Sequence, residues 1–217
     1  MRLNKKMILA VCMSGILLSL AVASRIHRPN LLGQGSDDIV VSFFQSDYKS
    51  LLKGLEEELS ESRIIVIARS TGKREYVYGN LKQEIAVERV VRGTDKGIEG
   101  KRVQWVGNGW MEHSDIKHVT VSTGFVNYLQ KGDCYLVFAE DCKRDYSGKE
   151  IILKAPKEVF GIRCLNLSKN ISQVCKQEGD QTEYKNVKDS EFFTNDEETL
   201  ESLEAMKQRL IHKFVKE

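Results

Sequence analysis

The stretch Arg63-Ile-Ile-Val-Ile-Ala-Arg-Ser70 decides the fold class, because β-branched residues dominate it and Thr71-Gly72-Lys73 follows as a turn signal. Four later segments have the same strand character and are bounded by turn residues: 84–92, 101–106, 134–139 and 150–154. No helical pattern alternates with these segments. We therefore expect a mainly β domain, a small barrel or sandwich, and not a parallel α/β sheet.

Helical patterns flank the strand-rich region on both sides. Before it, apolar residues recur every three or four positions from Tyr48 to Leu59, behind Ser46 or Asp47 as the cap. After it, Thr194-Asn-Asp-Glu197 has the form of a capping box, and an apolar stripe runs from Leu200 to Phe214. The overall class is thus α+β, with one helix before the strands and one at the C-terminus.

Three local features lie between these helices. The adjacent pair Val90-Val91 breaks the alternation of its strand and predicts a β-bulge. Residues 107–130 form a long connection with an extra strand near Val119–Ser122, and the polar residues 176–191 predict a loop. Because long connections in compact domains often carry function, a binding site is expected first in 107–130.

The charge of the chain is nearly balanced, with 33 basic and 31 acidic residues. Residues 1–24 hold three of the basic residues and no acid, so the rest of the chain has a net charge of −1. Such a body has no general electrostatic attraction to nucleic acid, and no nucleic-acid partner is expected.

The first 24 residues predict export. Arg2, Lys5 and Lys6 precede an uncharged run from Met7 to Ser24, and Ala21-Val22-Ala23 has the form of a signal-peptidase site. The run is also long enough, at about 27 Å as a helix, for residues 7–24 to be a retained single-pass transmembrane helix. Under both alternatives residues 25–45 form a tether and residues 46–217 lie outside the cytoplasm, secreted or anchored to the membrane.

Four cysteines follow the leader, an even number in an oxidising compartment: Cys134, Cys142, Cys164 and Cys175. They are candidates for disulfides, with three possible pairings, or for buried apolar thiols. None has C-x-x-C spacing, which disfavours a zinc ribbon or a thioredoxin-type site.

The strand segments resemble a known family. The order Ser62-Arg-Ile-Ile-Val-Ile-Ala68, Tyr78-Gly-Asn80, Val87-Glu-Arg-Val-Val-Arg-Gly93 and Lys131-Gly-Asp-Cys-Tyr-Leu-Val-Phe138 is similar to the inhibitory domain of the tissue inhibitors of metalloproteinases, and to uncharacterised exported bacterial proteins that contain a similar domain. The resemblance covers about residues 47–165. It implies a five-stranded OB-type barrel with a C-terminal helix, so residues 46–217 would form a TIMP-like domain.

The chain differs from that family at the residue that carries the family's inhibitory activity. Those inhibitors coordinate the zinc of the protease through a mature N-terminal cysteine, whereas Ser24 and Arg25 follow the possible cleavage site in this chain. The inhibitory mechanism therefore does not carry over, and the resemblance assigns no functional residue.

Chemically active residues are few. His113, Asp115 and His118 in the long connection are candidate metal ligands, although H-x-D-x2-H matches no familiar catalytic signature. No nucleophile motif or phosphate-binding loop is present, so no catalytic residue and no cofactor is expected.

Aromatic residues gather around the third strand and the long connection: Trp105, Trp110, Phe125 and Tyr128. OB-type barrels bind ligands with aromatic side chains in this region, which makes these four residues ligand-binding candidates; the alternative is that they fill or cap the core. The expected function is a non-enzymatic binding module outside the cytoplasm, for a protein, peptide or cell-wall glycan. The alternatives are a protease inhibitor, by resemblance, and a metal-dependent enzyme.

Overall fold

A computed structural model describes residues 40–42, 48–77, 80–93, 96–108, 111–115, 118–122, 128–155, 162–169, 171–175 and 181–216. All of them belong to one compact unit, residues 35–217. The predicted leader, residues 1–24, and most of the predicted tether lie outside this part. Within it, no helix is both long enough and apolar enough to cross a membrane.

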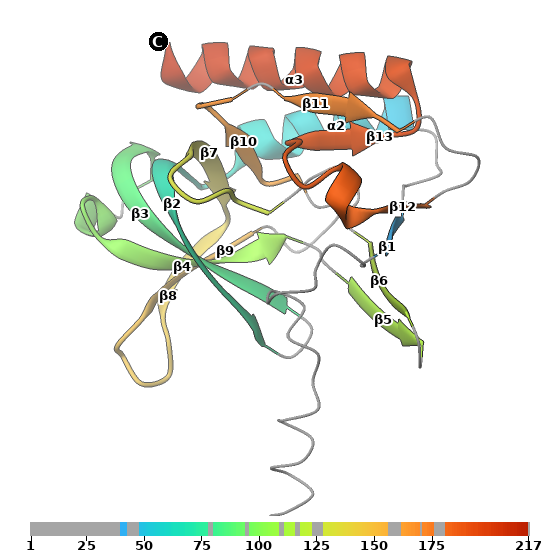
Figure 1. Cartoon of the computed structure of the whole chain (residues 1–217). Coiled ribbons are helices and arrows are strands. Elements are labelled where there is room, and N and C mark those ends of the chain that lie inside the picture. The colour runs from blue at the N-terminus through green and yellow to red at the C-terminus, as the bar shows by residue number, and fades with distance from the viewer. Residues whose placement is uncertain are drawn as a thin grey trace, which may run out of the picture. The chain divides into compact units, whose positions relative to one another are not determined.

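The larger sheet confirms a mainly β fold (Figure 1). Its seven strands follow the order β10-β7-β2-β3-β4-β9-β8, and neighbours are antiparallel except for β4 and β9. The bounds are β2 (Ile64–Val77), β3 (Asn80–Arg92), β4 (Arg102–Asn108), β7 (Cys134–Ala139), β8 (Asp141–Arg144), β9 (Ile151–Lys154) and β10 (Cys164–Asn166). The five predicted strands correspond to β2, β3, β4, β7 and β9.

The sheet is open in its hydrogen-bonded order, with β10 and β8 as its end strands, and does not show the closed five-stranded barrel that was expected. The reason lies in β7, which pairs with β2 on one edge and with β10 on the other. Its continuation β8 pairs with β9 instead. Only Glu140 separates β7 from β8 in the chain.

The long β2–β3 hairpin has three register shifts, between Ile65 and Val66, between Ile67 and Ala68, and between Ser70 and Arg74. The predicted bulge at Val90-Val91 is confirmed, since Ile65 pairs with Arg92 while Val66 pairs with Val90. The predicted turn at Thr71-Gly72-Lys73 is wrong, because β2 continues through it to Val77. The shift between Ser70 and Arg74 lies there, and Gly72 has a φ of 82°, so the glycine serves a bulge and not a turn.

A smaller sheet has the order β12-β1-β6-β5, with β1 (Val40–Ser42), β5 (Met111–Asp115), β6 (His118–Ser122) and β12 (Gln181–Glu183). The extra strand expected near Val119–Ser122 is confirmed as β6, and β5 joins it as a hairpin partner. Strand β12 lies in a segment predicted to be a loop. Strand β1 comes from the segment predicted to be a tether, and it pairs with both β6 and β12.

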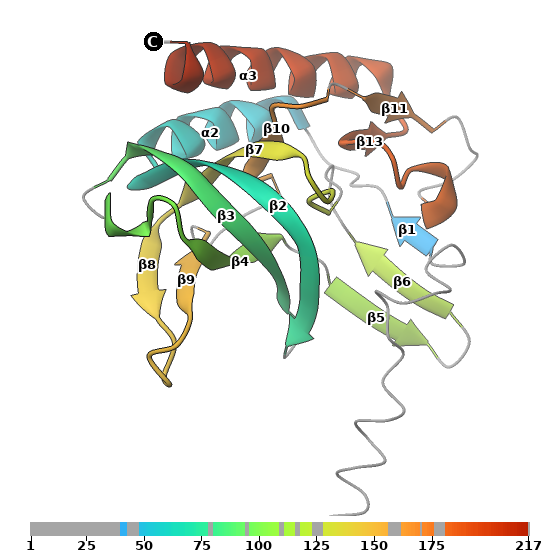
Figure 2. The same cartoon turned by 60° about the vertical axis from the view of Figure 1, so that its left-hand side comes forward.

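Two helices lie side by side against β7 and β10 (Figure 1 and Figure 2): α2 (Tyr48–Glu61) and α3 (Glu197–Val215). Both predicted helices are confirmed, but the cap of α3 is Asp196 and not Thr194, because the Asp196 carboxylate accepts from the Thr199 N–H at 2.6 Å. Short elements complete the fold: η2 (Lys96–Ile98), η3 (Tyr184–Asn186), and the parallel strands β11 (Ser172–Val174) and β13 (Phe192–Thr194).

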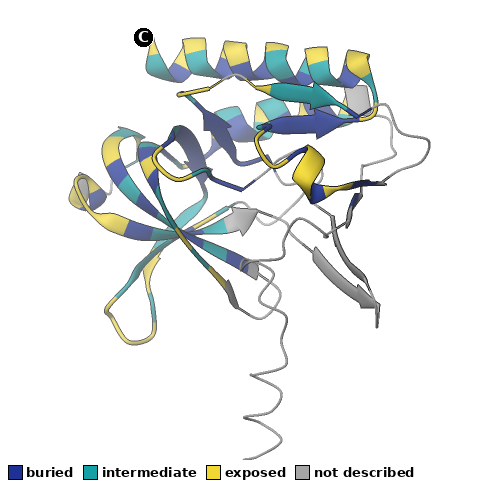
Figure 3. Ribbon diagram, viewed as in Figure 1, coloured by how far each residue is buried: buried dark blue, intermediate teal, exposed yellow. Residues whose placement is uncertain are grey.

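Two apolar clusters fill the two faces of β7 and of the first part of β2. Figure 3 shows where the buried residues lie along the ribbon. One cluster lies between the sheet and the helices, and is called the helix-side cluster: Leu52, Leu55, Leu59, Ile65, Leu136, Phe138, Ile162, Leu165, Phe192, Leu203, Met206, Leu210 and Phe214. The other lies on the opposite face, and is called the inner cluster: Val66, Ala68, Ile85, Val87, Ile98, Val103, Trp105, Leu129, Tyr135, Val137, Ala139, Leu153 and Cys164.

Candidate functional site

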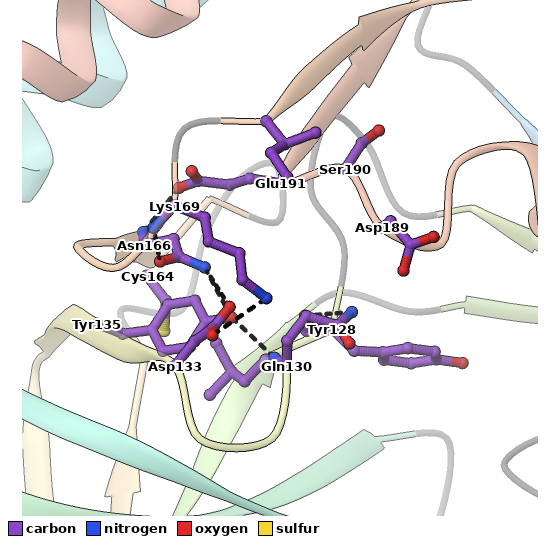
Figure 4. A pocket seen from close by; sticks show the side chains of 12 residues that line it. Tyr128, Gln130, Asp133, Tyr135, Cys164, Asn166, Lys169, Asp189, Ser190 and Glu191 are labelled. Atoms are coloured by element: carbon purple, nitrogen blue, oxygen red, sulfur yellow. Dashed lines mark hydrogen bonds and ion pairs between the residues drawn. The ribbon is translucent and has the colours of Figure 1, made fainter.

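A small cleft opens where three segments meet: residues 128–135 leading into β7, residues 164–171 from β10 onward, and residues 189–191 before β13 (Figure 4). Its lining is Tyr128, Leu129, Gln130, Asp133, Tyr135, Cys164, Asn166, Lys169, Ile171, Asp189, Ser190 and Glu191. The space open to water inside it is about 20 Å³, which suits one water molecule or one ammonium group.

A hydrogen-bond network made by buried side chains forms the wall of the cleft. The Asn166 amide donates to the Asp133 carboxylate at 2.9 Å and to the Tyr135 hydroxyl oxygen at 3.2 Å. The same hydroxyl oxygen accepts from the backbone N–H of Gln130 at 2.7 Å. Asp133, Tyr135 and Asn166 are each at least nine-tenths buried, so this network holds the loop, β7 and β10 in one arrangement.

Lys169 lies across the cleft from Asp133, as Figure 4 shows, with 3.3 Å between its ammonium nitrogen and the carboxylate. The two side chains differ in exposure, 52% for Lys169 and 9% for Asp133. The ion pair is therefore anchored on the acid, and the long, mostly solvated lysine is the member that a competing cation would displace most readily.

Behind the cleft, a second acid is paired with a buried cation. Glu191 accepts from the backbone N–H of Asn166 at 2.7 Å and from the Lys207 ammonium of α3 at 2.5 Å. Lys207 also donates to the carbonyl of Lys169 at 3.1 Å. Burial raises the pKa of Glu191 to about 7, while the Lys207 charge and its hydrogen bond act in the opposite direction.

The rim of the cleft combines an apolar and an acidic residue. Ile171 is 49% exposed, one of two large apolar side chains with high exposure among the described residues. Asp189 is exposed as well, on the segment that precedes β13. The rim thus offers an apolar contact beside negative charge, a combination suited to recognition rather than to packing.

The structure separates the predicted aromatic candidates. Trp105 is fully buried at 0% exposure within the inner cluster, so it is a core residue and not a ligand contact. Tyr128 lines the cleft but is only 5% exposed, with its ring 5.6 Å from that of Tyr184 and the Arg74 guanidinium 4.5 Å from its centre. Trp110 and Phe125 lie outside the described residues.

The candidate metal ligands lie on strands and not in a loop. His113 and Asp115 belong to β5 and His118 to β6; the structure describes their backbone but not their side chains. Among the side chains that it does describe, no group of three His, Cys, Asp or Glu residues is placed to hold a metal ion.

None of the four cysteines that follow the leader forms a disulfide in the structure. Burial raises the pKa of Cys134, Cys164 and Cys175, with Glu88 adding to the effect at Cys134. A raised pKa lowers the thiolate fraction at neutral pH, and only the thiolate is a strong nucleophile. The thiolate fraction of these three cysteines at neutral pH is therefore lower than that of an ordinary cysteine.

No protein-family model and no curated protein matches this chain.

The cleft was not predicted from the sequence. Asp133 had the pattern of a turn residue, and Asn166 lies in an Asn-Leu-Ser sequon. Its amide is instead buried and fully engaged with Asp133 and Tyr135. A local sequence signal for the cleft is weak, because its residues come from segments up to about 60 positions apart.

Proposed function

We propose that residues 40–216 form a non-enzymatic binding module that takes a peptide or protein segment at the cleft. The observation that carries this proposal is the exposed Ile171 beside an acid-lined space of the size of one ammonium group. Asp133, Asp189 and Glu191 outnumber Lys169 around that space. The ligand that fits best is a lysine side chain or a terminal amine next to an apolar residue.

The binding mode follows from the contacts of the cleft. A ligand ammonium would replace that of Lys169 at the Asp133 carboxylate, which is already held in place by Asn166. Because the acid is pre-positioned and the displaced lysine is mostly solvated, the exchange requires little reorganisation. The apolar neighbour in the ligand would cover Ile171.

The chemistry of the described thiols supports a binding role over catalysis. A cysteine nucleophile needs a depressed pKa and a neighbouring base. Cys134 instead lies 3.7 Å from the Glu88 carboxylate, whose negative charge opposes thiolate formation. The hydroxyl of Tyr135 has a raised pKa through burial and is engaged as an acceptor.

The peptide-binding proposal is tested with the full-length protein and a fluorescent peptide, acetyl-Gly-Leu-Lys-Leu-Gly-amide. Acetylation of its lysine is expected to weaken binding about tenfold, or about 1.4 kcal/mol. Asp189→Asn and Ile171→Ser should each weaken binding severalfold, whereas Glu201→Gln on the exposed face of α3 serves as the matched control. Equal affinity for the two peptides, or no binding by either, contradicts the proposal.

Presentation outside the cytoplasm is part of the same proposal and rests on residues 1–24. The basic start, the apolar run and Ala21-Val22-Ala23 support it. Fractionation of cells that express the full chain, followed by protease treatment of intact cells or spheroplasts, tests it. A cytoplasmic, protease-protected protein contradicts it, and the mass of the mature protein decides between cleavage and an anchor.

A five-stranded OB-type barrel is the finer fold that we propose, as the TIMP-like resemblance implies. Support comes from Glu140, whose N–H donates to the Lys154 carbonyl at 2.9 Å, while its neighbour Ala139 pairs with Ile64. Counting 134–144 as one strand lets the order β2-β3-β4-β9 return to β2. Nuclear Overhauser contacts from Ala139 to Ile64 and from Asp141 to Lys154 in one sample would support closure; loss of either contradicts it.

A further inference from the structure

The ion pairs and hydrogen bonds behind the cleft close into a ring, part of which Figure 4 shows. At the cleft, Asp133 binds the ammonium of Lys169 at 3.3 Å and the side-chain amide of Asn166 at 2.9 Å. The backbone N–H of Asn166 donates to the Glu191 carboxylate at 2.7 Å, and the same carboxylate accepts from Lys207 of α3 at 2.5 Å. Lys207 completes the ring, because it also donates to the backbone carbonyl of Lys169 at 3.1 Å.

The ring fixes the segment 166–169, which carries both of these partners of Asp133. The side-chain oxygen of Asn166 accepts from the backbone N–H groups two and three positions later, at 2.7 Å and 2.9 Å, so the segment is a tight local turn. Beyond the turn itself, Glu191 holds the start of the segment and Lys207 holds its end. The direction of the Asn166 amide, and with it the orientation of the Asp133 carboxylate, therefore depends on Glu191 and Lys207.

Lys207 is completely enclosed and does not line the cleft. It is 1% exposed, and it is not among the residues around the space that the ligand would enter. A cation out of water is stable only while its partners stay in place, and Glu191 and the carbonyl of Lys169 both serve it here. Because a shift of one member of a buried network disturbs several contacts at once, the position of α3 and the arrangement of segment 166–169 are linked.

We propose that Lys207 and Glu191 are positioning residues of the cleft, which keep Asp133 oriented for a ligand ammonium although Lys207 does not touch the ligand. The inference rests on the proposed peptide binding and adds to it a link between the site and α3. When a ligand ammonium displaces that of Lys169, the ring opens at one contact, and the path through Asn166, Glu191 and Lys207 remains intact. That path keeps the Asp133 carboxylate in place while its partner changes.

The first test titrates variants of the full-length protein with the peptide acetyl-Gly-Leu-Lys-Leu-Gly-amide. Lys207→Met with Glu191→Leu removes one charge of each sign, so no unpaired ion remains, but the Asn166 N–H loses its acceptor. Binding is expected to weaken about tenfold, as for one buried group left without its partner. Lys207→Met with Glu191→Gln keeps an oxygen for the Asn166 N–H and should recover part of that loss. Arg209→Gln with Glu56→Gln removes an ion pair between α3 and α2 that lies outside the ring, so this matched control should bind with unchanged affinity.

A second test needs no ligand, so its result is independent of the proposed function. Amide hydrogen exchange is measured by NMR without peptide, on variants that circular dichroism and urea denaturation show to be folded. In Lys207→Met with Glu191→Leu, exchange at the Asn166 backbone N–H should become about tenfold faster, while exchange at Val66 in the inner cluster stays unchanged.

Unchanged exchange at Asn166 overturns the inference, and so does equal peptide affinity of the parent protein and both folded double variants. A parent protein that binds no peptide contradicts the proposed function instead. Exchange at Asn166 then decides by itself whether Lys207 and Glu191 hold segment 166–169 in place.

Discussion

Residues Ile64–Ala68 of β2 and strand β7 are largely buried on both faces, and the two faces meet different neighbours. The inner cluster takes Val66, Val137 and the large ring of Trp105, all from strands of the sheet. The helix-side cluster takes Ile65, Leu136 and Phe138 from the same strands and packs them against α2 and α3. A strand with one solvated face alternates apolar and polar residues, whereas Ile64–Ala68 and β7 are continuously apolar.

Both sides carry ion pairs, but those of the helix side are more deeply buried: on the sheet, the Lys82 and Glu150 side chains, 2.8 Å apart, are 17% and 41% exposed. Arg163, before β10, contacts Glu58 of α2 at 3.0 Å, and its side chain is 2% exposed. Lys207 of α3 contacts Glu191 at 2.5 Å, and both of these side chains are buried. Apolar contacts alone would allow the helices to shift along the sheet. A buried ion pair disfavours any helix position in which its charges lose their partners. The comparison teaches that packing and partly exposed ion pairs hold the sheet, and that buried ion pairs also specify the helix positions.

The inner cluster should respond most strongly to loss of volume. Trp105→Ala is expected to lower the free energy of unfolding by about 4 kcal/mol, because it leaves a large cavity among closely packed strands. Urea denaturation of the full-length protein measures the change. Tyr146→Ala, at a fully exposed side chain, should stay within about 0.5 kcal/mol of the parent. A small effect at Trp105 would mean that the residue is not part of the core.

The helix side should respond to loss of charge. Lys207→Met leaves Glu191 buried without its cation and is expected to cost about 3 kcal/mol, measured by urea denaturation at pH 8. Removing both charges, as Lys207→Met with Glu191→Leu, should recover most of that loss because no unpaired ion remains. A double variant less stable than Lys207→Met would show that the pair is not the source of the effect.

The same pair predicts how stability depends on pH. Folding raises the pKa of Glu191 from its ordinary 4.5 to about 7, so the folded state binds more protons than the unfolded state between these values. The contribution of this group is complete below pH 4.5 and is lost as the pH rises through 7, with a slope of at most about 1.4 kcal/mol per pH unit. Glu191→Gln should remove that slope; an identical pH profile in the variant contradicts the assignment.

The smallest effect is expected at the surface contact between the helices. The Arg209 guanidinium of α3 donates to both oxygens of the Glu56 carboxylate of α2, at 2.9 Å to one and 2.7 Å to the other, and its side chain is 58% exposed. Arg209→Gln should cost about 0.5 kcal/mol, and a double-mutant cycle with Glu56→Gln should give a coupling that disappears in 1 M salt. A coupling that persists in high salt would mean that this ion pair is shielded from solvent in the way that the buried ion pairs are.

Local patterns were sufficient to predict a helix or a strand wherever apolar residues recur along the segment at the spacing of that element. The two apolar strands, the bulge at Val90-Val91 and both helices followed from residue spacing alone. The turn expected at Gly72 was wrong because a glycine with positive φ serves a bulge as well as a turn, and only the partner strand distinguishes the two. The short strands β10 to β13 were missed because three residues are too few to show a period.

The candidate site illustrates the same limit. Asp133, Asn166 and Glu191 meet only because β7 pairs with β10 and residue 191 lies beside Asn166, and nothing local marks them as neighbours. In the case of Trp105, an aromatic side chain has the same sequence signature in a core as at a binding surface. Burial, which depends on the whole fold, decided between them.

The sequence by itself determined the strand-rich class and the flanking helices, because hydrophobic period and capping chemistry act within a few residues. It also predicts the basic, apolar leader. Only the tertiary structure decided which strands pair, that β7 ends at Ala139 and β8 begins at Asp141, and that part of the long connection forms the β5–β6 hairpin. These features depend on contacts between residues far apart in the chain, whose energies no local pattern records.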